Sequence, residues 1–509
     1  MNMPAPADYL SSLQKKGVRF WIDKGQLRYH AHKGALSAED LARLRMMRAD
    51  IVAELTKLAE APEPGGLELR AGSIPAPLSF QQEWLLSLIE KHGNWQPAQA
   101  FAFHLAGFLK PQVLERSVDA ILRRHDALRS RVVSVHGRHR LEMDAPSNYQ
   151  LDIVSIPDVF AAEESRSVGF HTADLVARGV DPAIGPLIYV RLLRISDREH
   201  YLILVFHRLV ADCMSIGQVF RELWLLYGEE SQAQSVQLSG QSGQYRDYTT
   251  WQQAGDGQWQ QKHGAFWREY LHDATRIQWP AEGPIPGCEH GLTVLQGSFG
   301  VKLSAQLREL GRQTRSLPAL VMLTLYVSAV SRWCGQRDFV VPFNVAGRHA
   351  AHDSVVGCFS QVLYLRVRLK ADVPFPELLR LISGEFYKAV FHQDLGRISL
   401  SRPDLLGGTF CQWLSWHPAE LAGQEVYDVP RQLGISARPV HFQVAHNFSN
   451  VPAGATGLDV TFFESAGDIG VLLIFQREVL SESSMERFIH ELRVSAERIV
   501  NDPTQRSSG

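Results

Sequence analysis

Residues 206–215 have the sequence FHRLVADCMS, and the expected fold is organised around them. The apolar run Tyr201–Phe206 leads into this stretch, and its length and flanks predict a buried β-strand. Apolar residues at helical spacing follow in Ile216–Leu226 and predict a helix. The stretch is therefore expected to connect a buried strand to a helix. Its His, Arg, Asp and Cys side chains are the first candidates for a site.

Strands and helices alternate on both sides of this connection. Ile188–Ile195 is another short apolar run that predicts a buried strand, and Leu114–His125 has helical spacing. Residues 231–245 are rich in Ser, Gln and Gly and predict a loop between two lobes. The sequence shows no internal repeat of fixed period. We therefore expect an α/β fold.

The first 57 residues form a separate small pattern. Val18–Ile22 and Leu27–His30 are rich in aromatic and β-branched residues and flank a Gly-containing turn, which predicts a β-hairpin. Ser37–Asp40 has the pattern of a helix start, and apolar residues at helical spacing follow it. We expect a helix–hairpin–helix unit over residues 1–57. Residues 58–76, rich in Pro, Gly and Ala, are expected to be a linker.

The composition is that of an ordinary globular protein. Apolar residues make up 45% and charged residues 21%, and the formal net charge of −2 gives no reason to expect nucleic acid or an anionic membrane as a partner. The sequence lacks a signal peptide pattern and a long apolar run, so we expect a cytoplasmic protein. The five scattered cysteines predict reduced thiols rather than disulfides or a zinc site: Cys213, Cys288, Cys334, Cys358 and Cys411.

Across residues 77–500 the chain resembles the condensation domain of nonribosomal peptide synthetases. The resemblance rests on nine short motifs in the order of the family. They are PLSFQQEWL (77–85), RHDALR (124–129), GPL (185–187), FHRLVADCMS (206–215), YRDY (245–248), FW (266–267), GR (347–348), GCFSQVL (357–363) and HQD (392–394). The fourth of them occupies the place of the family's HHxxxDGxS motif.

This resemblance implies two lobes, each similar to chloramphenicol acetyltransferase, that form a V around a central tunnel. We expect the N-terminal lobe over residues 77–240 and the C-terminal lobe over residues 241–509. The family joins a carrier-bound acyl thioester to an amine or alcohol. The phosphopantetheine arms of partner carrier proteins enter the tunnel, and no cofactor bound by the domain itself and no metal are implied.

The N-terminal unit likewise resembles the small docking domains that begin some synthetase subunits. The family's hairpin receives a peptide tail from an upstream protein that bears an acyl or peptidyl carrier. The candidate docking residues are Arg19, Trp21, Arg28 and His30.

The active-site motif departs from the family at its second histidine. In the family this residue acts as general base or positions the nucleophile, which an imidazole with a pKa of about 6.5 can do. Arg208 stands there instead. A guanidinium remains protonated and cannot be a base, but it can donate hydrogen bonds to a carbonyl or an oxyanion. His207, at the first position, is expected to be a buried structural histidine, with replacement of the missing base as the alternative.

Three further positions of the motif carry structural expectations. The family's Asp forms an ion pair with the Arg of the GR motif, so the resemblance predicts a pair between Asp212 and Arg348. Cys213 replaces a Gly, so its side chain should narrow the tunnel, and an unreactive core thiol is favoured over a nucleophile. Ser215 retains the last residue of the motif.

Other candidate sites are weaker. His349, His352 and Asp353 suggest a metal site, but they follow the GR motif in an expected loop, and solvated side chains are favoured. The sequence has no Gly-rich phosphate loop, GxSxG elbow or HExxH motif, which leaves an adenylation or thioesterase activity unsupported.

Two classes of function remain. The first is an enzyme that acts in trans in nonribosomal peptide or hybrid polyketide biosynthesis, in chain transfer or release. This is expected because the sequence ends soon after the helical stretch Val494–Pro503. The acceptor would be a second carrier-bound substrate or a free small molecule. The second is a condensation fold without catalysis that binds carriers or recruits tailoring enzymes, which an HRxxxD motif also fits. A heterocyclisation domain is set aside because its motif begins with Asp and residue 207 is His.

Overall fold

The computed structural model describes most of the chain beyond residue 74 and a short part before it. The described residues are 19–23, 26–30, 75–91, 97–146, 148–157, 163–177, 181–232, 238, 243–280, 292–348, 352–369, 373–393, 402–414, 425–440 and 457–502. The chain divides into two compact units, Met1–Ala71 and Gly72–Gly509.

The N-terminal unit contains the expected hairpin. Strands β1 (Arg19–Asp23) and β2 (Gln26–His30) are antiparallel, and their register pairs Arg19 with His30 and Trp21 with Arg28. The candidate docking residues thus occupy two cross-strand pairs. The helices expected on either side of the hairpin lie outside the described residues.

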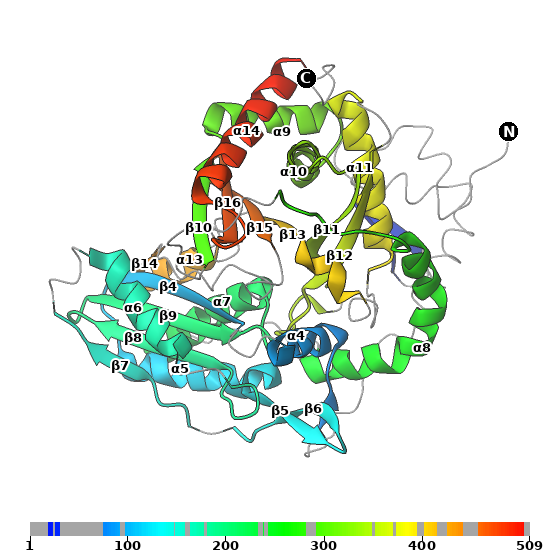
Figure 1. Ribbon diagram of the computed structural model, residues 1–509. Coiled ribbons are helices and arrows are strands. Elements are labelled where there is room, and N and C mark those ends of the chain that lie inside the picture. The colour runs from blue at the N-terminus through cyan, green and yellow to red at the C-terminus, as the bar shows by residue number, and fades with distance from the viewer. Residues whose placement is uncertain are drawn as a thin grey trace. The chain divides into compact units, whose positions relative to one another are not determined.

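The second unit contains two cores, and the first surrounds a mixed five-stranded sheet (Figure 1). The strands, in spatial order, are β14 (Ser436–Pro439), β4 (Ala98–Ala106), β9 (Glu199–His207), β8 (Ile188–Arg194) and β7 (Asp152–Ser155). The accompanying helices are α4 (Phe80–Lys91), α5 (Pro111–Arg124), α6 (Glu164–Ala177) and α7 (Cys213–Gln232). A small sheet of β3 (Ala76–Pro77), β6 (Arg138–Met143) and β5 (Ser130–Val135) completes this lobe, with the 3-10 turn η1 (Asp126–Arg129) beside it.

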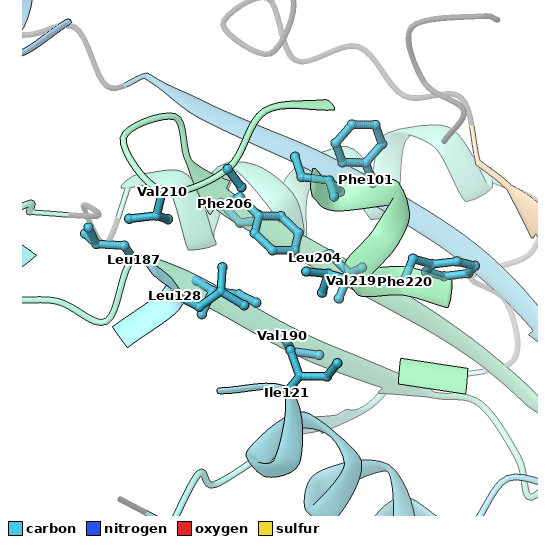
Figure 2. Packing of buried hydrophobic residues seen from close by; sticks show 14 of the residues in the cluster. Phe101, Ile121, Leu128, Leu187, Val190, Leu204, Phe206, Val210, Val219 and Phe220 are labelled. Atoms are coloured by element: carbon cyan, nitrogen blue, oxygen red, sulfur yellow. The ribbon is translucent and has the colours of Figure 1, made fainter. Parts of the chain in front are cut away.

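The strands and helices expected on either side of residue 208 are confirmed as β8, β9, α5 and α7. Figure 2 shows the packing of this core, in which Phe206 and Val210 lie among side chains that include Leu128 and Leu187. The backbone that carries Arg208 is therefore held by buried apolar residues on both sides of it.

The second core surrounds a six-stranded sheet. Its order is β10 (Leu292–Ser298), β16 (Asp468–Gln476), β15 (Leu458–Ser465), β13 (Thr409–Leu414), β11 (Asp338–Val345) and β12 (Gln361–Arg368). The helices of this lobe are α9 (Val301–Gln313), α10 (Pro318–Cys334), α11 (Phe375–Phe391) and α14 (Glu482–Asn501), and the 3-10 turn η4 (Pro403–Gly407) precedes β13. Helix α10 is buried at every position from Leu320 to Val330, and most of these residues are apolar.

The long helix α8 (Tyr245–Tyr270) belongs to both cores (Figure 1). Its first turns contribute Tyr245 and Tyr248 to the first core, and its last turns contribute Trp267 to the second. The Tyr245 hydroxyl donates to the Cys358 carbonyl oxygen at 2.6 Å and lies 2.8 Å from Ser79 Oγ. The start of α8 thus joins the residues just before α4 to those just before β12.

The segment 425–439 packs on the first lobe, although it follows the expected lobe boundary at residues 240/241. Helix α13 (Glu425–Gln432) packs on α7, and β14 pairs with the edge strand β4. The ring of Tyr427 lies 6.1 Å from Phe103 and 5.9 Å from Phe220, centroid to centroid. The lobe boundaries remain predictions. At the other end, the expected linker ends at Ala76, which already belongs to β3 and pairs with Leu141 of β6.

Among the described residues, no single helix has the length and apolarity to cross a membrane. The pair Val301–Gln313 and Pro318–Cys334, bent by 104°, passes that test by length and composition alone.

The packing of Gly357 against Tyr245 yields a stability prediction. A Cβ atom on Gly357 would lie 1.9 Å from Cδ2 of the buried Tyr245 ring, so Gly357→Ala should destabilise the protein by about 3 kcal/mol or more. Urea unfolding followed by tryptophan fluorescence measures this. The matched control is Gly384→Ala in α11, where a Cβ meets nothing within 4 Å. It should be neutral or stabilising by about 0.5–1 kcal/mol. Equal stability of the two variants would contradict the packing.

Candidate active site

The candidate site lies on the connection between β9 and α7. Its backbone is fixed from several sides: the Arg208 amide donates to the Pro97 carbonyl at 2.8 Å, and Gln82 Nε2 donates to the Leu209 carbonyl at 2.7 Å. Asp212 then caps α7, because its Oδ1 accepts from the Ser215 amide at 2.8 Å. These contacts hold the turn in one conformation and join it to the first turn of α4, which carries Gln82.

His207 is buried and hydrogen-bonded to the backbone, as expected for a structural histidine. Its side chain is 1% exposed, and Nδ1 accepts from the Leu209 amide at 3.1 Å. Burial, aided by the neighbouring Arg208 charge, lowers the pKa of His207 to about 3. The imidazole is therefore neutral at physiological pH, with its proton on Nε2. A group with so low a pKa is a poor general base near pH 7.

Arg208 lines the cavity between the two cores. Burial lowers the pKa of its guanidinium, while the thiols of Cys213 and Cys358 and the Asp459 carboxylate act in the opposite direction. An arginine keeps its proton in proteins because its pKa starts above 12. The cavity therefore has a permanently charged hydrogen-bond donor in its wall, at the position where the family has a histidine.

The expected ion pair between Asp212 and Arg348 is present. Arg348 Nη2 lies 2.8 Å from Asp212 Oδ1, and both side chains are almost fully buried. Arg348 also donates to Ser215 Oγ at 2.6 Å and to the carbonyls of His352 and Val355. Asp212 Oδ2 accepts from the Phe359 amide at 3.3 Å.

Ser215 and two glycines complete this junction. Ser215 Oγ donates to the Gly357 carbonyl at 2.9 Å and lies 3.0 Å from the Gly357 amide. Gly347 has a φ of +62°, and a Cβ there would lie 2.1 Å from the Phe359 carbonyl oxygen. Only glycine fits this close approach. The residues of three sequence motifs thus meet around one carboxylate.

The expectation that His352 is solvated is wrong. Its side chain is 7% exposed, its ring stacks on Phe359 with centroids 5.7 Å apart, and its carbonyl accepts from Arg348. The polar residue is buried because its ring packs against the rings of Phe359 and Tyr248. Within the part of the chain that the structure describes, no group of three His, Cys, Asp or Glu residues is arranged to hold a metal ion. His349 lies outside that part.

The two thiols at the site are protonated. Gln99 Nε2 donates to Cys213 Sγ at 3.2 Å, and burial raises the pKa of Cys213. Burial also raises the pKa of Cys358 to about 12. Because the thiolate is the nucleophilic form, both thiols are unreactive at neutral pH. The sequence offered no signal for Gln99, whose strand is a run of alternating small and aromatic residues.

The cavity has a volume of about 200 Å³ and contains Arg208, Asp212 and Cys213 in its wall. Both lobes line it. The apolar lining residues are Trp84, Leu85, Ala100, Phe101, Ala211, Met214, Val345, Ala346, Val362, Trp413 and Leu414, and the further polar or thiol-bearing ones are Gln81, Gln99, Asn344, Cys358, Ser360 and Gln412. Such a mixture of apolar surface and a few hydrogen-bonding groups is typical of a site for small organic groups.

Comparison with known families agrees with this arrangement. The sequence profile of the condensation domain matches residues 75–402, more than half of the chain. The chain belongs to the condensation-domain family. The profile of the TubC N-terminal docking domain matches residues 7–56, so a docking domain precedes the condensation domain.

Known relatives of this condensation domain are much longer proteins. Chondramide synthase cmdD of Chondromyces crocatus is 30% identical over 305 residues, which cover 58% of this chain and 8% of that protein. The chain thus spans a small part of the curated relatives that it matches.

Solved structures with this fold include two that cover most of the chain. The EpoB cyclization-docking bidomain from Sorangium cellulosum has a TM-score of 0.71 at 17% identity, with 98% of each chain covered. The X-domain from teicoplanin biosynthesis has a TM-score of 0.69 at 19% identity, with 88% of this chain and 99% of that chain covered. At these identities the likeness shows the fold alone.

The ion pair of this condensation domain can be tested with a double-mutant cycle. Asp212→Ala and Arg348→Ala should each cost about 3–5 kcal/mol, because each leaves a buried charge without its partner, and the double variant should cost clearly less than the sum. Chemical denaturation measures all three. The control pair, Asp428 and Arg431, has side chains 47% and 75% exposed, and its removal should cost about 0–1 kcal/mol. Additive losses at Asp212 and Arg348 would contradict the coupling.

Proposed function

We propose that this chain is a condensation enzyme that acts in trans in nonribosomal peptide or hybrid polyketide biosynthesis in the cytoplasm. It takes an acyl chain from the phosphopantetheine arm of an upstream carrier protein and joins it to an amine or an alcohol, in chain transfer or chain release. The observation that carries the proposal is the position of Arg208, a charged donor in the wall of the cavity between the two lobes.

Arg208 is suited to stabilise the transition state rather than to remove a proton. When the nucleophile attacks the thioester carbonyl carbon, negative charge develops on the carbonyl oxygen, and a guanidinium can donate hydrogen bonds to it. The tetrahedral intermediate then expels the pantetheine sulfur. The proton lost by the amine or alcohol ends on the departing thiol, so the overall reaction needs no cofactor of the domain itself.

The environment of His207 supports this assignment. With a pKa lowered to about 3 and Nδ1 already bonded to the Leu209 amide, His207 is a poor replacement for the missing base. Its role in the proposal is to fix the turn that carries Arg208. Cys213 and Ser215 are likewise assigned structural roles, Cys213 in narrowing the cavity and Ser215 in joining α7 to the segment around Gly357.

The partner proposed for the docking domain is the upstream protein that bears the donor carrier. The docking domain precedes the condensation domain, and its hairpin contains Arg19, Trp21, Arg28 and His30 as candidate contacts for a peptide tail. The acceptor is either a second carrier-bound substrate or a free small molecule.

The alternative is a platform without catalysis. Two observations favour it: the loss of the motif's second histidine to Arg208, and the likeness in fold to the teicoplanin X-domain, which has also been solved in complex with OxyB. Under this alternative the cavity performs no chemistry, and the surface of the domain binds carriers or tailoring enzymes.

Substitution of Arg208 separates the two functions. If Arg208 stabilises the oxyanion, Arg208→Ala should lower turnover by roughly ten- to a thousandfold, as the loss of one such donor does. Intact-protein mass spectrometry of the acyl-loaded carrier, incubated with candidate acceptors, measures it. Arg116→Ala is the control, because this arginine is exposed and lies on α5. It should retain full turnover.

Two further outcomes decide between the two functions. If the wild type shows no turnover and Arg208→His gains it, the natural protein lacks condensation activity and the platform is favoured. With an alcohol acceptor, a rate that falls as the pH drops through about 6–7 would contradict the role given to His207, because it would indicate an imidazole base.

Removal of the docking domain tests the partner. Deletion of residues 1–57 should abolish capture of the upstream carrier protein while leaving the unfolding transition of the condensation domain unchanged, because the two form separate compact units. Surface plasmon resonance and calorimetry measure the two effects. Unchanged affinity for the carrier after the deletion would remove the docking assignment.

A further inference from the structure

Gln99 is a buried amide side chain in the wall of the cavity. It lies on β4 and is 8% exposed. Its direct cross-strand partner on β9 is Phe206. The turn that follows β9 is tied to the start of β4, because the Arg208 amide donates to the Pro97 carbonyl at 2.8 Å. The pairing of β4 with β9 therefore places Gln99 beside the turn that carries Arg208, and both residues line the cavity.

The Gln99 amide is bonded to the protein through its nitrogen. Nε2 donates to Cys213 Sγ at 3.2 Å, at the start of α7. Within the part of the chain that the structure describes, no donor is bonded to Gln99 Oε1. An amide oxygen withdrawn from bulk water is costly unless a donor reaches it. Because Gln99 lines the cavity, a molecule bound there is placed to supply that donor.

The other glutamines of the cavity wall are placed differently. Gln81 uses both ends of its amide: Oε1 accepts from Gln252 Nε2 at 3.2 Å, and Nε2 donates to the Tyr248 hydroxyl at 3.4 Å. Gln412 lies on β13 in the C-terminal lobe, where it donates to Thr461 Oγ1 at 2.7 Å. Gln99 thus combines an available acceptor with a place beside the cavity arginine.

We propose that Gln99 holds the attacking nucleophile, because its Oε1 accepts a hydrogen bond from the N–H or O–H of the amine or alcohol. The lone pair of the nucleophile is then directed at the thioester carbonyl carbon, while Arg208 donates to the carbonyl oxygen. Gln99 takes up no proton, so it orients the nucleophile without replacing the missing base. This inference rests on the proposed function and adds a second residue that contacts the substrate.

Turnover with the acyl-loaded carrier protein and candidate acceptors tests this role. Gln99→Met removes the acceptor and keeps a side chain of similar length, and it should lower kcat by about ten- to a hundredfold. The KM for the acyl-loaded carrier should stay constant, because Gln99 contacts the acceptor and not the carrier. Gln99→Glu keeps an acceptor oxygen at the same reach and should retain roughly tenfold more turnover than Gln99→Met. Gln313→Met, at an exposed residue of α9, is the control and should keep full turnover.

The melting temperature separates this role from a structural one. Gln99→Met gives up a hydrogen bond to a neutral thiol and gains an apolar side chain in a largely apolar wall. Its melting temperature should therefore rise or stay within about 3 °C of that of the wild type. A larger fall would overturn the inference, because it would mean that Gln99 serves to tie β4 to α7.

The outcomes for the inference and for the proposed function differ. A wild type that turns over, with a Gln99→Met variant that is equally fast, would overturn the inference and leave the proposed function standing. An equal loss in Gln99→Met and Gln99→Glu would also overturn it, since the acceptor oxygen would then be irrelevant. A wild type without turnover would remove the proposed function and this inference with it.

Discussion

The carboxylate of Asp212 and the guanidinium of Arg348 form a buried ion pair on which the geometry of the site depends. Asp212 caps α7 through the Ser215 amide, and Arg348 follows the end of β11 in the other lobe. One interaction therefore fixes the start of a helix in the first lobe relative to a strand end in the second. Breaking it would leave a buried charge without its partner, which is costly. The Arg348 guanidinium also donates to the carbonyls of His352 and Val355 and to the Ser215 hydroxyl.

Beside this ion pair, the cavity wall contains Arg208 at the position where the family motif has its second histidine. A histidine at position 208 would be able to exchange a proton near neutral pH, whereas an arginine offers only charge and donors. His207 is a poor replacement for the missing base, because burial and the adjacent cation lower its pKa and its Nδ1 accepts from the Leu209 amide. The protonated thiols of Cys213 and Cys358 add no nucleophile. Under the proposed function, such a site serves electrostatic stabilisation of a reaction in which the nucleophile needs little activation.

Much of the fold could be predicted from the sequence, because the patterns that indicate strands, helices and hairpins are local. The apolar run before His207, the helical spacing after Ser215 and the Gly-bearing hairpin near the N-terminus each depend on residues a few positions apart, and the corresponding elements are present. The family motifs added the pairing of Asp212 with Arg348, which periodicity alone does not reveal. The burial of His352 could not be predicted, because nothing in the neighbouring sequence indicates that its ring stacks on Phe359.

By itself, then, the sequence determined the α/β class, the separate N-terminal unit and the departure from the family motif at Arg208. The tertiary structure alone decided which residues surround that arginine. Gln99 and Gln412 line the cavity because β4 and β13 run to it. The pairing of β14 with the edge strand β4 is likewise a contact between distant parts of the sequence that only the tertiary structure reveals. Contacts between residues hundreds of positions apart are set by how sheets and helices bury their apolar faces together, and no short stretch of sequence encodes them.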